Sequence, residues 1–293
     1  MFQITYERMI LYEKHSYCYK INKEGDDTLT LLFAEVNLNI IKIKSYWDAF
    51  IYNEQETETC DVNFLRAVIG NKPKKILEIA CGSGRILAPL ANDGHTVTGL
   101  DCNEYMLSFI QQKLKANNAE FYKADAIVDD WGEGYDVVIE AANLMINIIT
   151  DGNYANVQRL LIHKAAKALK HNGYLYLDFN LFIHPEHFFD CNIEKEIFSG
   201  VDNHGVHGRY SIMSSKYFPE SKTVRSEIRT TITLPNGDKY TIDDVTVKHI
   251  PTLEQVHSWL DEAGLIIEQE YGDYSRNAIS EKTCRCIIYA RKA

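Results

Sequence analysis

The stretch of sequence that decides the fold is Ile76-Leu77-Glu78-Ile79-Ala80-Cys81-Gly82-Ser83-Gly84-Arg85-Ile86-Leu87. Its apolar start is typical of a buried strand, and after Gly82-Ser83-Gly84 the pattern becomes that of a helix. Glycines let the backbone come close to a ligand, and the start of a helix presents unpaired N–H groups. A tight turn that binds nothing would use the same residues. The stretch therefore predicts a strand, a turn and a helix, and it leaves a ligand at the turn open.

Outward from this unit, strand-like and helix-like segments alternate along most of the chain. Such alternation is typical of a parallel sheet with helices on both faces. Gly173 and Gly264 are expected helix stops, and Thr252 with Gln255 has the spacing of a capping box. The expected strands cover residues 75–80, 96–100, 119–122, 136–140, 174–179, 265–270 and 284–290, and the expected helices cover residues 61–69, 85–91, 103–116 and 153–170.

Two segments depart from this alternation. Residues from about 208 to 250 read as a meander of longer strands, in which Asn236-Gly237 is a strong hairpin signal. The first part of the chain has strand-like runs at 16–21 and 28–33 and an aromatic cluster, 46–52, ahead of a helix. The expected domains are an N-terminal extension (1–60), a core (61–195 and 251–293) and an inserted antiparallel β segment (196–250).

Two carboxylates at the ends of neighbouring strands indicate what the turn binds. Glu78 lies before the turn, and Asp101 ends the next strand, 19 residues after Gly82. An acid about 20 residues after a nucleotide-binding turn reaches ribose hydroxyls. Leu87 stands where a dinucleotide fingerprint needs Gly or Ala, and the chain has no Gly-Lys-Ser/Thr. Since Glu78 would repel a pyrophosphate but suits a cationic amino-acid end, the natural candidate is S-adenosylmethionine.

On these residues, roughly residues 60–293 resemble the class I (Rossmann-like) S-adenosylmethionine-dependent methyltransferases, in the small-molecule branch that carries a β-meander insertion. Glu78-x-x-x-Gly82-x-Gly84 is similar to the family's first motif, and Asp101 to its ribose-binding acid. Residues 124–126 look like its adenine-contacting motif, and residues 136–143 like the fourth strand, which opens on the active site. The resemblance implies an α/β fold: a doubly wound, seven-stranded, mostly parallel sheet whose last strand is antiparallel.

Two departures from the family pattern bear on this resemblance. Ala80 replaces the first of the motif's glycines, and we interpret it as tolerated because alanine has the smallest side chain available. After the fourth strand, Asn143-Leu144-Met145-Ile146 stands where methyltransferases of nucleic-acid base amino groups typically carry Asn/Asp-Pro-Pro-Tyr/Phe. This difference argues against an acceptor of that kind.

The resemblance assigns each part of S-adenosylmethionine to residues around the turn. The turn backbone would contact the methionine portion, Asp101 the ribose, and Asp125 with Ala126 the adenine. Glu78 can equally bond turn amides, and an Asp after a strand is also a common helix cap. The expected cofactor-binding residues are Glu78, Ala80, Gly82, Gly84, Asp101, Cys102, Met106, Asp125, Ala126 and Glu140.

The acceptor side is less clearly marked. Displacement at a sulfonium methyl has an excellent leaving group, so positioning and desolvation are the protein's main contributions. A general base is needed only if the acceptor arrives protonated, and the expected candidates are Tyr210 and His207. Aromatic residues before the core would wall the pocket or contact the sulfonium; the alternative is an ordinary helix packed on a sheet. The expected acceptor-site residues are Tyr46, Trp47, Asn143 and Tyr176.

Composition narrows the partners. The chain has 293 residues, and 31 Lys and Arg against 41 Asp and Glu give a net charge of −10. This disfavours nucleic acid, because binding phosphates needs clustered basic residues. Seven scattered cysteines fit a reducing compartment, and no signal peptide or long apolar span is evident, so we expect a cytoplasmic protein without a membrane partner. His184 and His187 lack a certain third ligand, so no metal is expected.

The sequence thus predicts an S-adenosylmethionine-dependent methyltransferase that acts at N or O of a small molecule. A homodimer is one option for its assembly. Two other classes of function stay open. One is a protein or RNA methyltransferase, which the acidic charge disfavours, and the other is a homologue that binds S-adenosylmethionine for different chemistry, such as aminocarboxypropyl transfer.

Overall fold

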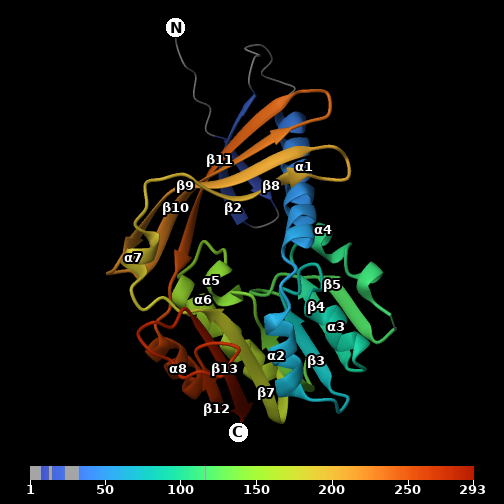
Figure 1. Ribbon diagram of the computed structural model, residues 1–293, viewed down its shortest axis with the longest axis vertical. Helices are drawn as coiled ribbons and strands as arrows, with labels where there is room; N and C mark the ends of the chain where they lie inside the picture. The colour runs from blue at the N-terminus through green and yellow to red at the C-terminus, as the bar shows by residue number, and fades with distance from the viewer. Residues whose placement is uncertain (1–7, 13–14, 24–32, 116) are drawn as a thin grey trace. The chain divides into compact units, whose positions relative to one another are not determined.

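Two compact units make up the protein, of which the computed structural model describes residues 8–12, 15–23, 33–115 and 117–293 (Figure 1). The first unit, called here the sheet-and-helix unit, contains residues 57–185 and 249–293. The second, called here the antiparallel unit, combines the described residues up to 56 with residues 186–248. The expected N-terminal extension and insertion therefore share one unit.

The sheet-and-helix unit is built on seven strands in the order β12-β13-β7-β6-β3-β4-β5. Neighbouring strands from β7 to β5 are parallel, and β13 is antiparallel to both β7 and β12. This confirms the predicted Rossmann-like α/β fold. The strands are β3 (Lys75–Ile79), β4 (Thr96–Asp101), β5 (Ala119–Lys123), β6 (Tyr135–Glu140), β7 (Leu169–Asn180), β12 (Leu265–Tyr271) and β13 (Arg285–Lys292).

Helices cover this sheet. Apolar residues of α2 and α3 form one buried cluster with side chains of β3, β4, β6 and β7, such as Ile76 and Val137. Their strand neighbours Leu77 and Val138 are fully buried as well, so both faces of the sheet are covered. The helices of this unit are α2 (Cys60–Ile69), α3 (Leu87–Asn92), α4 (Glu104–Leu107), η1 (Gln111–Lys113), α5 (Leu144–Asn147), α6 (Tyr154–Ala168) and α8 (Leu253–Glu262). A further helix, α7 (Pro185–Phe189), belongs to the antiparallel unit from its second residue on.

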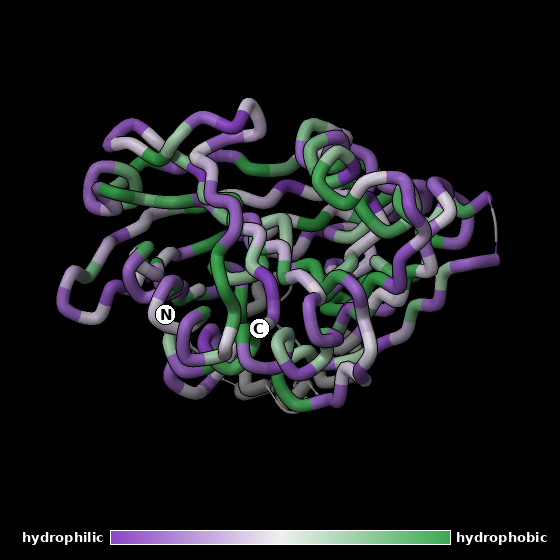
Figure 2. Tube along the Cα trace, turned by 90° about the horizontal axis from the view of Figure 1, so that it is seen from below, coloured by the Kyte–Doolittle hydropathy of each residue, from purple (hydrophilic) through white to green (hydrophobic). Residues whose placement is uncertain are grey.

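Local signals in the sequence explain several boundaries. The predicted capping box is present, because the Thr252 side chain accepts from the Gln255 N–H and the Gln255 side chain accepts from the Thr252 N–H. Gly264, after α8, has the predicted left-handed conformation, with φ 70°. Coloured by hydropathy, the trace shows hydrophobic segments separated by hydrophilic turns (Figure 2).

Two predictions for this unit were wrong in detail. The helix expected over 103–116 is instead two short pieces, α4 and η1. The Asn92 side chain donates to the Lys113 carbonyl and accepts from the Lys115 N–H, so it occupies backbone groups that a continuing helix would pair. Gly173 lies inside β7 rather than after a helix: a Cβ there would come within 3.0 Å of the Lys170 carbonyl oxygen.

The antiparallel unit has six strands in the order β1-β2-β11-β10-β9-β8 and one long helix, α1 (Phe33–Gln55). The predicted Asn236-Gly237 hairpin joins β10 to β11, with Gly237 at φ 89°. The strand expected at 16–21 is part of β2, whereas residues 28–32 of the other expected strand lie outside the described residues. The strands are β1 (Arg8–Tyr12), β2 (His15–Lys23), β8 (Lys195–Val201), β9 (His207–Phe218), β10 (Thr223–Thr233) and β11 (Lys239–His249).

Candidate functional site

The turn after β3 has an unusual backbone. Ala80, Gly82 and Gly84 all have left-handed φ angles, of 54°, 53° and 76°. Such angles cost little for glycine but strain alanine. A Cβ added to Gly82 would meet nothing within 4 Å, whereas one on Gly84 would lie 3.1 Å from Ile110. Gly84 is thus needed for packing, and open space lies in front of Gly82.

Asp101 joins the end of β4 to this turn. One carboxylate oxygen accepts from the Gly82 N–H at 2.9 Å, and the other accepts from the Asn103 N–H at 2.8 Å. Burial raises the pKa of Asp101, and the two backbone N–H groups act against that rise. Because each carboxylate oxygen can accept more than one hydrogen bond, the anchored carboxylate keeps capacity for two hydroxyl donors. The structure therefore brings together the two residues that the spacing of 19 had linked.

Glu78 lies at the same end of the sheet and is also buried. Its Oε2 has no hydrogen-bond partner among the residues that the structure describes. Burial raises the pKa of Glu78 well above its ordinary value, while the Arg85 charge and a hydrogen bond from the Leu87 N–H lower it. A buried carboxylate oxygen without a partner is costly, and a cationic ligand group would remove that cost. Glu78 thus accepts a backbone hydrogen bond from Leu87, which is the alternative role predicted for it. Its Oε2, which has no partner among the described residues, can still accept from a ligand.

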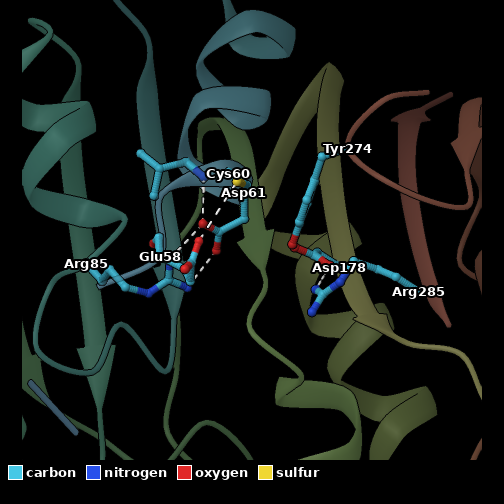
Figure 3. A network of polar contacts seen from close by, with 8 residues as sticks. Glu58, Cys60, Asp61, Arg85, Asp178, Tyr274 and Arg285 are labelled. Atoms are coloured by element: carbon cyan, nitrogen blue, oxygen red, sulfur yellow. Dashed lines mark hydrogen bonds and ion pairs between the residues drawn. The ribbon is translucent and has the colours of Figure 1, made fainter. Parts of the chain in front are cut away.

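A third carboxylate, Asp61, is one that the sequence analysis does not single out. Arg85 donates to both of its oxygens, at 2.7 and 2.6 Å, and also to the Glu58 carbonyl at 2.9 Å (Figure 3). This bidentate pair connects the start of α2 to the turn after β3. Arginine directly after a glycine turn and aspartate at a helix start are common, so the sequence offered only a weak signal for it.

The end of β7 carries a fourth buried acid, Asp178. It accepts a hydrogen bond from the Tyr274 hydroxyl at 2.7 Å and forms an ion pair with Arg285 (Figure 3). Tyr176, an expected acceptor-site residue, lies two positions earlier on the same face of β7, and its buried hydroxyl has no partner in the described part of the chain. Burial and the Asp178 charge raise the pKa of Tyr176, so the phenol is neutral. None of Asp178, Tyr274 and Arg285 was predicted.

The expected adenine-contacting residues form a tight turn after β5. The Asp125 carboxylate accepts from the Ile127 N–H at 2.8 Å, and the Asp125 N–H donates to the Asp129 carboxylate at 2.8 Å. Residues 126–128 form a turn, and no regular helix begins there. Asp125 therefore caps this turn through the Ile127 N–H and does not cap a helix. Cys102 and Met106 lie after β4, in the loop and in α4.

Glu140 and Asn143 do not join this arrangement as expected. In the β3–β6 register Ile139 lies beside Glu78, so Glu140, its neighbour in the strand, points to the opposite face of the sheet. Glu140 has 0% exposure, neither carboxylate oxygen has a partner among described groups, and burial raises its pKa to about 8. The Asn143 Oδ1 accepts from the Asn180 N–H at 2.6 Å and so links the ends of β6 and β7.

The two expected catalytic residues belong to the antiparallel unit and are not brought together. Tyr210 and His207 are three positions apart on β9, so their side chains lie on opposite faces of that strand. Tyr210 packs with the cluster around Trp47, and burial raises its pKa to about 12. His207 is exposed.

The aromatic cluster at 46–52 precedes α2 as expected, and it lies within a helix of its own, α1. Trp47 is 1% exposed, and its Nε1 donates to the Gly200 carbonyl at 3.2 Å. A Cβ on Gly208 would lie 2.0 Å from its ring. The Tyr46 hydroxyl donates to Asn203 Oδ1 at 2.9 Å. For Trp47 the geometry favours the packed-helix alternative over a pocket wall.

In the structure, the carboxylate of Glu186 lies close to the histidine pair, His184 and His187, at the start of α7. Ligand atoms of His184, Glu186 and His187 lie within 4.8 Å of one another. All three residues are exposed, and exposed groups of this kind are common without an ion. We therefore propose no metal site there. None of the described helices is long and apolar enough to cross a membrane.

Comparisons with known proteins identify a methyltransferase domain in the chain. Residues 76–173 match a family model described as a methyltransferase domain. A putative methyltransferase of Geobacillus sp. (strain WCH70) is 25% identical over 75% of this chain and 85% of its own length.

Solved structures share the fold. The sugar N-methyltransferase KedS8 of Streptoalloteichus sp. superposes with a TM-score of 0.62 at 16% identity, covering 98% of this chain and 100% of its own. CalS10, an amino pentose methyltransferase of Micromonospora echinaspora, has a TM-score of 0.54 at 17% identity, covering 92% of this chain and 100% of its own.

S-adenosylmethionine fits the residues at the turn. Its cationic amino group suits the buried Glu78 oxygen that lacks a partner, and the open space before Gly82 leaves room for its methionine portion. The ribose hydroxyls suit the anchored carboxylate of Asp101. With the matching family model, these features identify the chain as a member of the class I S-adenosylmethionine-dependent methyltransferases.

Proposed function

We propose that this methyltransferase transfers the methyl group of S-adenosylmethionine to a nitrogen or oxygen atom of a small molecule. The observation that carries the proposal is the charge of the buried polar groups at the carboxyl ends of β3, β4 and β7. They include the carboxylates of Glu78, Asp101 and Asp178, and Arg285 is paired with Asp178. Such a site suits a neutral or cationic acceptor better than one that brings phosphates.

The structural neighbours support a small acceptor. KedS8 and CalS10, a sugar N-methyltransferase and an amino pentose methyltransferase, match nearly the whole chain, including the antiparallel unit. The net charge of −10 disfavours RNA, which needs clustered basic residues. A small acceptor with an amino or hydroxyl group satisfies both observations.

When bound, S-adenosylmethionine supplies a methyl group on a sulfonium. The protein's own groups then bind and orient: Gly82 and Asp101 hold the turn and the ribose, and Glu78 holds the amino end. An amine acceptor must lose its proton before it attacks. Tyr210 and His207 stay the proposed catalytic residues, and since they face opposite sides of β9, one of them at most serves this role. Because burial raises the pKa of Tyr210 to about 12, its phenol keeps its proton, so His207 is the proposed proton acceptor of the two.

Two linked experiments test the proposal. In a thermal-shift titration, S-adenosylmethionine and S-adenosylhomocysteine should each raise the melting temperature of the protein, because a ligand that binds only the folded state stabilises it. The protein is then incubated with S-adenosylmethionine and a panel of amines, amino sugars and phenols, and products are followed by mass spectrometry. We expect a methylated acceptor together with S-adenosylhomocysteine. Release of methylthioadenosine instead would show a different transfer chemistry, and methylation confined to added RNA or peptides would contradict a small acceptor.

A further inference from the structure

Lys164 of α6 makes an unusually complete set of contacts with the turn after β5. Its ammonium group donates to the carbonyl oxygens of Ala126, Ile127 and Asp129, at 2.6, 3.1 and 2.6 Å. A lysine ammonium has three N–H donors, so the turn uses all of them. The same nitrogen lies 4.9 Å from the centre of the Trp131 ring. These contacts hold one side of the turn.

A second donor reinforces one of these carbonyls. The Trp131 Nε1 donates to the Ala126 oxygen at 3.0 Å, and the Trp131 side chain is buried. Two donors on one carbonyl leave the peptide plane between Ala126 and Ile127 little freedom to rotate. The Asp125 carboxylate, which accepts from the Ile127 N–H, is therefore held in a fixed position as well.

The neighbouring lysine of α6 provides a contrast. Lys167, three positions further on the same side of the helix, has a side chain that is 65% exposed. It pairs only loosely, at 3.6 Å with Asp130 and 3.7 Å with Glu133. Exposed pairs of this kind contribute little. Lys164 and Lys167 thus share a helix, a charge and acidic neighbours, and differ in the carbonyl contacts.

We infer that Lys164 is a positioning residue for cofactor binding: by holding the Ala126, Ile127 and Asp129 carbonyls it keeps the turn in the shape that receives the adenine end. This inference rests on the proposed function and on the assignment of Asp125 and Ala126 to the adenine. A turn that adopts the binding shape only part of the time weakens the apparent affinity by the fraction of time it is competent. Losing three charge-assisted hydrogen bonds is sufficient to lower that fraction about tenfold.

The test compares Lys164→Met with Lys167→Met by isothermal titration calorimetry well below the melting temperature. The ligands are S-adenosylhomocysteine and methylthioadenosine, which share the adenosine half but differ in the amino-acid end. We expect Lys164→Met to raise both dissociation constants about tenfold and Lys167→Met to leave both unchanged. A merely structural lysine would lower the melting temperature without changing either constant.

Three results decide the matter. Equal affinities for the native protein and Lys164→Met would overturn the inference, as would a loss confined to S-adenosylhomocysteine, because that loss would lie at the amino-acid end. If Lys164→Met does not fold, Trp131→Phe, which removes the indole N–H on the Ala126 carbonyl together with part of the buried ring, carries the same test with the same expected direction. If the native protein bound neither ligand, the cofactor assignment itself would be wrong.

Discussion

Arg85 connects the turn after β3 to the start of α2, and replacing it by methionine should destabilise the protein strongly. Its two hydrogen bonds to Asp61 are 2.7 and 2.6 Å long, and the side chains of the pair are only 18% and 10% exposed. Breaking a buried pair costs about 3–5 kcal/mol because a charge is left without a partner, and partial exposure here brings our expectation to about 2–3 kcal/mol. That corresponds to a fall in melting temperature of about 5–10 °C.

A matched control lies on the surface. Arg66 makes the same bidentate contact with Asp93, at 2.5 and 3.0 Å, but its side chain is 38% exposed. Arg66→Met should cost less than about 1 kcal/mol, as exposed pairs usually do. Differential scanning calorimetry of both variants gives the comparison.

A double-mutant cycle separates the interaction free energy of Arg85 and Asp61 from the other effects of removing the arginine. Asp61→Asn together with Arg85→Met removes both charges, so the double variant should be less destabilised than the sum of the two single variants, by about 1–2 kcal/mol. Equal melting temperatures for Arg85→Met and Arg66→Met, or strict additivity in the cycle, would refute the reasoning from burial.

Three further predictions follow from single contacts. Asp101→Asn should weaken S-adenosylhomocysteine binding at least about tenfold in calorimetry, since the ribose hydroxyls lose a charged acceptor; an unchanged affinity would remove Asp101 from the site. Burial raises the pKa of Glu140 to about 8, so the folded state holds this proton more tightly than the unfolded state, and the free energy of unfolding should fall as pH rises from about 5 to 8. Urea unfolding should show Glu140→Gln to be more stable than the native protein at pH 8 and less dependent on pH; identical pH dependence would contradict this. Gly208→Ala, whose Cβ would lie 2.0 Å from the Trp47 ring, should lower stability by about 1–3 kcal/mol, and an unchanged unfolding curve would show that the ring can move aside.

Whether an interaction could be predicted depended on how far apart its residues lie in the sequence. The turn and Asp101 were predicted because strand, glycines and acid follow one another within a short, regular spacing. The Asp178–Arg285 pair joins residues 107 positions apart, and the arginine at 85 meets an aspartate 24 positions earlier. No local pattern marks such pairs: the pairing of β7 with β13 brings Asp178 and Arg285 together, and the packing of α2 beside the turn after β3 brings Asp61 to Arg85.

The same reason explains the errors in secondary structure and the direction in which Glu140 points. The segment 103–116 has helical periodicity, but the side chain of Asn92, far from it in the sequence, pairs with its backbone and breaks it. Glu140 follows the predicted strand as expected, yet the register of β3 with β6 turns it away from Glu78. The N-terminal extension and the insertion share a sheet because β2 pairs with β11, which no pattern in either segment indicates.

Transfer of an isotopically labelled methyl group to a cell extract of the source organism tests the central claim most directly. The protein is incubated with methyl-labelled S-adenosylmethionine and the extract, which is then separated by ultrafiltration into small molecules and macromolecules. The account predicts label in an organic product of the small-molecule fraction, dependent on Asp101. Label confined to the macromolecules, or found only in methylthioadenosine, would contradict it.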